Sequence, residues 1–111
     1  MKPIKTFAAV LSLSLLLSGH GHAASVTANI VNAGAYSDGR VFVTLSAPLA
    51  DPVCPQSRFD VAPTNPAGKT ALATAYAAIA AGKSIVVTTV GCYGGFPTLD
   101  TTAGSVFYIV N

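Results

Sequence analysis

The chain has 111 residues, of which 51% are hydrophobic and 9% are charged. A chain of this length is expected to fold as one domain with a modest core. Its formal net charge of +2 comes from Lys2 and Lys5, because the rest of the chain holds four basic and four acidic residues. A neutral domain lacks the positive field that attracts phosphates, so the composition argues against nucleic acid and anionic membranes as partners.

A secretory signal peptide is predicted over residues 1–23. A positively charged start precedes an apolar run over residues 7–17, and small residues occupy the two positions that a signal peptidase reads. The run is much shorter than the roughly 20 residues of a transmembrane helix. We expect cleavage after Ala23, with Ala24 as the alternative, and a secreted or periplasmic domain over residues 24–111 that has no membrane span.

Two cysteines, Cys54 and Cys92, remain in the predicted mature domain. Exported domains of this size often add a disulfide bond because their core is small, and pairing is the default in an oxidising compartment. The alternative is a metal-binding thiol pair. It would lack further ligands, since both histidines, His20 and His22, leave with the signal peptide. We therefore predict a disulfide and no metal site.

Three strands are predicted in the first half of the domain. Residues 25–32 are rich in β-branched side chains, and an Asp-Gly pair then supplies the turn of a hairpin. Residues 40–46 form the return strand. Residues 47–56 contain three prolines, which argues for an irregular loop rather than a central strand. Residues 58–61 are a short third strand.

One helix is predicted over residues 69–81. Its apolar positions recur at helical spacing, at Leu72, Ala75, Tyr76 and Ile79. This spacing draws one stripe along a helix, and we expect the stripe to pack against the sheet. Gly82 is placed to end the helix.

The C-terminal part predicts two more strands, over residues 84–90 and 106–110, separated by a loop rich in glycine and threonine. The order β-β-β-α-β-β is that of the OB-fold, a five-stranded Greek-key barrel with one helix between strands 3 and 4. The predicted class is mainly β and OB-fold-like, and a generic small α+β domain is the alternative. An immunoglobulin-like sandwich would need about seven strands.

The helix and the strand after it resemble a known family. Residues 70–91, TALATAYAAIAAGKSIVVTTVG, look like the helix, Gly-Lys and strand unit of small secreted bacterial proteins similar to AB5 toxin B subunits, the subtilase cytotoxin B subunit in particular. Residues 41–45, Cys54, Cys92 and the terminal strand at 106–110 match the framework of that group. The resemblance implies an OB-fold, a disulfide, ring-like homo-oligomers and, in the toxin members, glycan binding. It carries no sialoglycan-binding residue onto this chain.

Few groups in the mature domain could perform catalysis. It has no histidine, no glutamate and, once the disulfide forms, no free thiol. Ser-His-Asp and Cys-His arrangements and two-histidine metal sites are therefore excluded. Three of its four aspartates, Asp38, Asp51 and Asp100, have simpler roles in turns and loops. We expect no enzymatic activity and no cofactor.

Aromatic side chains are the main candidates for binding. Tyr93 and Phe96 can stack on the apolar faces of sugars, and Thr98 can supply hydrogen bonds beside them. Tyr36, at the predicted hairpin tip, is a second candidate. The alternative is that the rings of Tyr93 and Phe96 close one end of the barrel, as apolar residues of small domains usually serve packing.

The leading prediction is a secreted or periplasmic non-enzymatic binding module of OB-fold type, directed at a glycan. The alternative from another class is a structural or envelope-associated protein whose partner is a protein. A third hypothesis is a toxin B-like subunit, which would need an enzymatic partner encoded nearby. Arg40 and Arg58 are read either as a surface cation site or as solvated strand charges.

Overall fold

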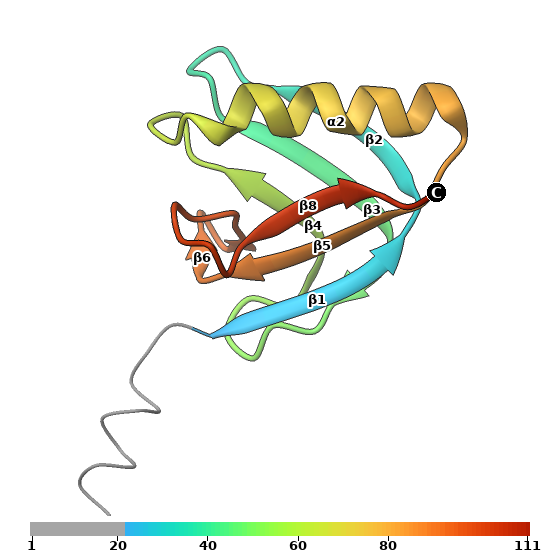
Figure 1. Cartoon of the computed structure of the whole chain (residues 1–111). Helices are drawn as coiled ribbons and strands as arrows, with labels where there is room; N and C mark the ends of the chain where they lie inside the picture. Colours follow the sequence, from blue (N-terminus) through green and yellow to red (C-terminus); the bar gives the residue numbers. More distant parts are fainter. Residues whose placement is uncertain (1–21) are drawn as a thin grey trace, which may run out of the picture.

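The structure, a computed structural model that describes residues 22–111, is a mainly β domain with one helix (Figure 1). The elements in chain order are β1 (Ala23–Ala28), β2 (Ile30–Ala35), β3 (Val41–Leu49), β4 (Gln56–Val61), α2 (Ala67–Ala81), β5 (Ile85–Val90), β6 (Cys92–Tyr93), β7 (Phe96–Pro97) and β8 (Val106–Ile109). The predicted signal peptide lies outside the described residues except for its last two positions. None of the described helices is long and apolar enough to cross a bilayer.

The strands form two antiparallel three-stranded sheets, in the orders β1-β5-β8 and β2-β3-β4, and a two-stranded ribbon of β6 and β7. An isolated parallel bridge between Asp60 and Thr98 connects β4 to the segment after β7. Within residues 22–111 no ladder joins β4 to β8, so the two sheets are not closed into a barrel. The prediction of a mainly β domain with one helix is confirmed.

The predicted first strand over residues 25–32 is in fact two strands, so this prediction was wrong. Asn29 alone separates β1 from β2, and at this residue the chain passes from one sheet to the other. The Asn29 backbone exchanges hydrogen bonds with Ser46, and its side chain accepts one from Ser84. The β-branched composition is the same on both sides of Asn29, which is why it does not reveal the break.

The proline-rich segment after residue 46 is only partly a loop. β3 continues to Leu49 through Pro48, and its pairing with β4 shifts register between Thr44 and Leu49. Proline cannot donate a ladder hydrogen bond, so the irregular pairing falls where Pro48 lies. The irregular loop that the prolines predict is confined to residues 50–55.

Helix α2 ends as predicted, but it buries a different face. Gly82 adopts a left-handed conformation with a φ of 64° and closes the helix. The buried positions are Gly68, Ala71, Ala75 and Ala78. Tyr76 and Ile79 are 50% and 45% exposed, so the predicted stripe was wrong at these two positions. Small side chains let the helix axis lie close to the sheet, and a Cβ on Gly68 would meet Val41 at 3.5 Å.

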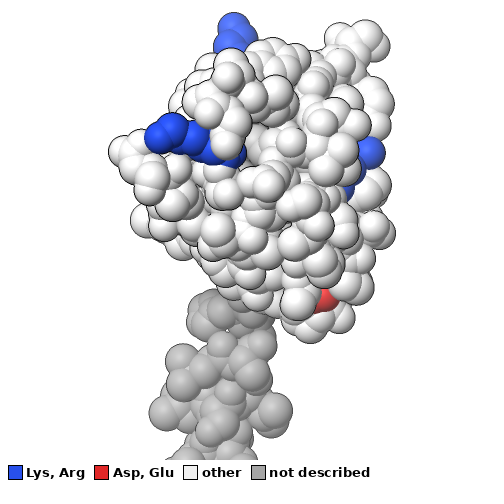
Figure 2. Space-filling view, turned by 90° about the vertical axis from the view of Figure 1, so that its right-hand side faces the viewer, with Lys and Arg blue, Asp and Glu red and all other residues white. Residues whose placement is uncertain are grey.

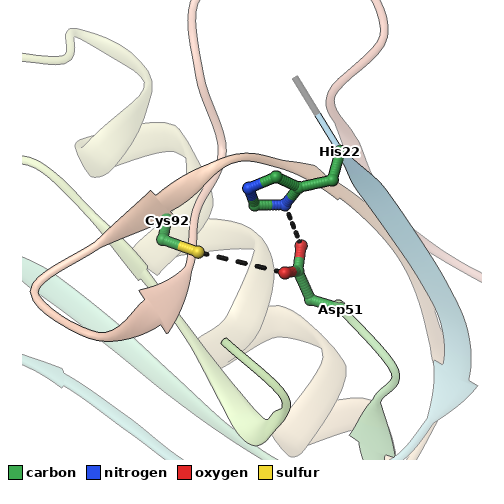
Figure 3. A group of neighbouring side chains, drawn as sticks. All are labelled: His22, Asp51 and Cys92. Carbon is green, nitrogen blue, oxygen red and sulfur yellow. Dashed lines mark hydrogen bonds and ion pairs between the residues drawn. The ribbon is translucent and has the colours of Figure 1, made fainter. Parts of the chain in front are cut away.

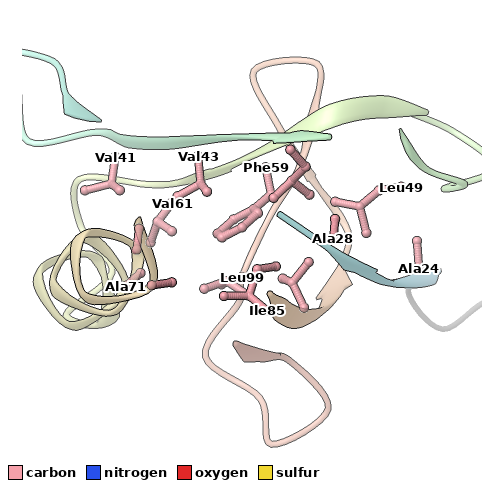
Figure 4. Packing of buried hydrophobic residues seen from close by; sticks show 14 residues of the cluster. Ala24, Ala28, Val41, Val43, Leu49, Phe59, Val61, Ala71, Ile85 and Leu99 are labelled. Carbon is pink, nitrogen blue, oxygen red and sulfur yellow. The ribbon is translucent and has the colours of Figure 1, made fainter. Parts of the chain in front are cut away.

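The core lies between the two sheets and the helix (Figure 4). Its largest side chain, Phe59, is fully buried and packs edge-on against Phe107, with ring centres 5.0 Å apart. The predicted disulfide is confirmed: Cys54 and Cys92 are bonded, with their Cα atoms 6.3 Å apart. The bond joins the loop after β3 to the start of the β6-β7 ribbon.

Candidate binding site: an arginine and aromatic cluster

Asp60 of β4 has a fully buried carboxylate that binds two arginine side chains. Arg40 donates through Nε to Oδ2 at 2.6 Å, and Arg58 donates through Nε to Oδ1 at 2.7 Å and through Nη2 to Oδ2 at 2.9 Å. The Asp60 side chain is 0% exposed, while those of Arg40 and Arg58 are 21% and 22% exposed. Two cations against one carboxylate leave the cluster with a net positive charge.

Strand alternation places these groups on one face of the β2-β3-β4 sheet. Arg58 and Asp60 are two residues apart in β4 and therefore point to the same side, opposite to Phe59 in the core. Phe42 of β3 is the register partner of Asp60, and Arg40 immediately precedes β3. The sequences RVF and RFD on neighbouring strands thus bring together two cations, a ring and a carboxylate.

Four aromatic rings surround the two guanidinium groups: Tyr36, Phe42, Tyr93 and Phe96. The guanidinium carbon of Arg58 lies 4.1 Å from the centre of the Phe96 ring, and that of Arg40 lies 4.9 Å from the centre of the Tyr93 ring. The Tyr36 hydroxyl accepts a hydrogen bond of 2.9 Å from Arg58 Nη2. A cation over a ring face is attracted by the quadrupole of the ring. The hairpin tip, β3 and the ribbon therefore meet at the arginines.

The predicted binding residues Tyr36, Tyr93 and Phe96 come together here from two separate loops. Neither Tyr93 nor Phe96 belongs to the hydrophobic core. Thr98 lies deeper: it is 8% exposed, and its hydroxyl donates a hydrogen bond of 2.6 Å to the Asp60 carbonyl. Sequence analysis missed Asp60, whose only signal is its two-residue spacing from an arginine on a strand.

The turn of the ribbon fits closely against Arg40. Gly94 has a φ of +59°, and a Cβ at this position would lie 2.6 Å from Arg40 Nη2. Only glycine combines this backbone conformation with so close an approach. The next residue, Gly95, has a φ of +87° but no heavy atom within 4 Å of its would-be Cβ. Gly94 therefore shapes the site, whereas Gly95 serves the turn alone.

Both arginines keep donors that the described part of the chain does not use. Arg40 Nη1 and Nη2 and Arg58 Nη1 make no hydrogen bond within residues 22–111. The hydrogen bonds to Asp60 raise the pKa of Arg58 above its usual value, so this side chain stays charged. The cluster can offer charged donors beside aromatic ring faces.

A hollow of about 250 Å³ adjoins Tyr93. Its polar lining comes from Thr64, Asn65, Thr98, Asp100 and Thr101. Tyr93 thus contributes both to this hollow and to the arginine cluster. Together they form one candidate site with an aromatic ring at its centre, and we call it the Tyr93 site.

A second group of side chains, His22, Asp51 and Cys92, has donor atoms within 4.8 Å of one another (Figure 3). The sulfur of Cys92 is bonded to Cys54, so it supplies no thiolate for a metal. His22 lies within the predicted signal peptide. In the mature chain Asp51 would be the one member of this group still able to bind a metal, so the group does not suit a metal centre.

The Asp51 carboxylate instead organises the loop that carries Cys54. Its Oδ1 accepts hydrogen bonds from the backbone N–H groups of Val53 and Cys54, and its Oδ2 lies 2.7 Å from His22 Nδ1. Burial by itself raises the pKa of Asp51, but the hydrogen bonds outweigh burial and hold the pKa below its usual value. The charged form of Asp51 is therefore built into the fold.

Comparisons with protein families, with curated proteins and with solved structures gave no match to this chain.

Proposed function

We propose that the chain is an exported, non-enzymatic binding module that recognises a glycan at the Tyr93 site. The observation that carries this proposal is the shared position of Tyr93, which contacts the Arg40 guanidinium and lines the adjoining hollow. Sugars present an apolar ring face beside hydroxyl groups. A site that pairs an aromatic ring with charged and neutral hydrogen-bond partners is complementary to both features.

The electrostatics favour a sugar over a polyanion. The predicted mature chain holds four basic and four acidic residues, so it has no overall positive field. Figure 2 shows one face of the molecule on which charged side chains are few and widely separated. The positive charge of the Tyr93 site is local, and it suits a single acceptor-rich or anionic group on a ligand.

We further propose that the two sheets are the halves of an OB-type Greek-key barrel. Four pairings support this topology, with β1 and β2 together acting as its first strand: β2 with β3, β3 with β4, β1 with β5, and β5 with β8. A closed barrel would also need β4 beside β8, and within residues 22–111 no ladder joins them. OB-folds bind oligosaccharides through loops and one strand face, and the Tyr93 site lies on such loops.

The absence of catalysis is part of the proposal. Residues 24–111 hold no histidine and no glutamate, and both sulfurs are in the disulfide. Asp60, the carboxylate of the cluster, is held by two arginines and is not exposed. General acid and base chemistry needs an accessible group with a suitable pKa. The other carboxylate of the Tyr93 site, Asp100, accepts hydrogen bonds from the N–H and hydroxyl of Thr102 in its own loop.

A glycan array tests the proposal directly. The mature domain, labelled and applied to the array, should bind a defined set of glycans. Tyr93→Ala should weaken that binding roughly tenfold, since an aromatic contact is worth about 1 kcal/mol or more. Tyr108→Ala is the matched control, because Tyr108 is a 51% exposed tyrosine on β8 of the other sheet. Absence of any reproducible glycan signal, or equal binding by the Tyr93 variant, would reject the proposal.

A protein partner is the second candidate, and the outer face of the β1-β5-β8 sheet favours it. Val106 and Tyr108 are exposed on β8, next to the half-buried Val86 of β5. Exposed apolar groups on a sheet often mark protein contacts. Recovery of a protein from envelope extracts that is lost in Tyr108→Ala but kept in Tyr93→Ala would support this alternative. A complex with an enzymatic subunit, or a ring of identical chains, would be detected in the same extracts by its larger mass.

A further inference from the structure

Asp51 is a buried carboxylate that depends on one side chain, that of His22, beyond its own loop. Its side chain is 0% exposed, and Oδ1 is taken by two backbone N–H groups of its own loop. Within residues 22–111 the only hydrogen-bond donor to Oδ2 is the His22 ring, at 2.7 Å (Figure 3). The other neighbour is the disulfide, with Cys92 Sγ 3.9 Å from Oδ1. No lysine or arginine of the described residues forms an ion pair with Asp51.

The predicted signal cleavage would remove this partner. His22 lies two positions before Ala24, which is the first residue of the mature chain if cleavage follows Ala23. A buried carboxylate that loses its hydrogen-bond partner is strongly unfavourable unless another group or water replaces it. The mature protein therefore needs a new donor near Oδ2.

Cleavage itself creates such a donor. The α-amino group of Ala24 becomes a free ammonium, which is largely protonated at neutral pH. Strand alternation puts His22 and Ala24 on the same face of the chain, and Ala24 is buried in the core. Residues two apart on a strand are separated by roughly 7 Å, and the His22 side chain already spans part of that distance to Asp51.

The part of β1 that cleavage leaves is held against β5. Ala24 pairs with Thr89, and the ladder continues to the pair of Ala28 and Ile85. The Thr89 hydroxyl, in the neighbouring strand, donates to the Ala24 carbonyl at 3.4 Å. Ala24 therefore stays next to β5 after cleavage, close to the loop that carries Asp51.

We propose that, in the mature protein, the α-ammonium of Ala24 replaces the His22 imidazole as the partner of Asp51. Removal of the signal peptide then fastens β1 to the disulfide-bonded loop at Cys54. This inference rests on cleavage after Ala23 and is independent of glycan binding.

The experiment uses the protein exported from a bacterial host with its own leader. Mass spectrometry should show a chain that starts at Ala24. The pKa of its α-amino group, measured by NMR titration, should exceed the ordinary range by roughly 1 to 3 pH units, because an opposite charge lies beside it. In Asp51→Asn this pKa should return to the ordinary range. Asp100→Asn, which alters a loop carboxylate bonded to Thr102, should leave it raised.

A second comparison keeps the test decisive if Asp51→Asn fails to fold. A chain produced to begin at His22 places its α-ammonium two residues further out and retains the imidazole. Its α-amino pKa should be ordinary. An ordinary value in the chain that begins at Ala24, or a mature chain that begins at any other residue, overturns the inference. Either result leaves the glycan test unaffected, since neither Ala24 nor Asp51 belongs to the Tyr93 site.

Discussion

The guanidinium carbon of Arg58 lies 4.1 Å from the centre of the Phe96 ring, so β4 and the β6-β7 ribbon share one contact surface. Phe96 also lies 5.7 Å from the guanidinium carbon of Arg40. The buried carboxylate of Asp60 forms ion pairs with both arginines. The position of the aromatic rings therefore depends on a carboxylate that no ligand could touch.

Replacing Asp60 should reveal this dependence. Asp60→Ala leaves two arginines without their shared counterion, and breaking a buried ion pair typically costs about 3 to 5 kcal/mol of unfolding free energy. Urea unfolding of the variant measures the loss. Asp38→Ala is the control, since Asp38 is exposed and, within residues 22–111, its side chain bonds only the Arg40 N–H, so its loss should stay near 1 kcal/mol. Similar losses in the two variants would contradict the role of Asp60.

Substitutions at two adjacent glycines of the β6-β7 ribbon can distinguish an effect on the binding site from the cost of backbone strain. Gly94→Ala and Gly95→Ala both place a Cβ at positive φ, which costs about 1 kcal/mol of stability. Only the Gly94 variant also drives a methyl group into the Arg40 guanidinium. We expect Gly94→Ala to lose more stability in thermal unfolding than Gly95→Ala, because the Arg40 guanidinium must shift, and glycan binding to fall several-fold more in Gly94→Ala. Equal binding by the two would show that Arg40 does not contribute to the site.

The disulfide closes a loop with a sequence separation of 38 residues. In the chain-entropy description, such a loop contributes about 4 kcal/mol by restricting the unfolded chain. Unfolding of the Cys54→Ala/Cys92→Ala double variant should show a loss of this order. Addition of reductant to the unmodified protein should give a matching loss, and no further loss in the double variant. A double variant as stable as the native chain would argue against this role.

The helix carries a prediction that follows from its small buried residues. Ala75 is fully buried against the sheet, whereas Ala77 is exposed. Ala75→Leu should therefore lose about 1 to 3 kcal/mol of unfolding free energy through overpacking. Ala77→Leu should change stability by less than about 0.5 kcal/mol, because both residues have high helix propensity. If Ala77 proved the more sensitive position, the helix would have to be rotated relative to the structure.

The sequence predicted where the elements lie in the chain more accurately than which face of each element is buried. The strand at Ile85–Val90, the helix end at Gly82 and the disulfide all follow from local chemistry: β-branched side chains, a glycine cap and two cysteines in an exported chain. The buried face of α2 could not be predicted in the same way. Alanine occupies most of the helix surface, so side-chain size did not reveal that the smaller residues face inward.

The candidate site shows the same limit. Tyr36 was identifiable as a candidate because an aromatic residue at an exposed hairpin tip has little packing to do. Tyr93 and Phe96 were identifiable as aromatic residues of a glycine-rich loop, with packing as the alternative. Their meeting point was not identifiable, because it depends on the pairing of β3 with β4 and on the bridge from Asp60 to Thr98. These contacts join residues that are distant in the chain, and no local pattern encodes them.

Asn29 sets a strict limit on how this protein can change in length. It is the sole residue between β1 and β2, so the junction cannot absorb a change in length. Side chains along each strand alternate between the two faces of the sheet with a period of two. Inserting or deleting one amino acid here would turn one sheet inside out relative to the other. We therefore expect natural and engineered length variants to tolerate additions in the turn at residues 101–104, and none at this junction.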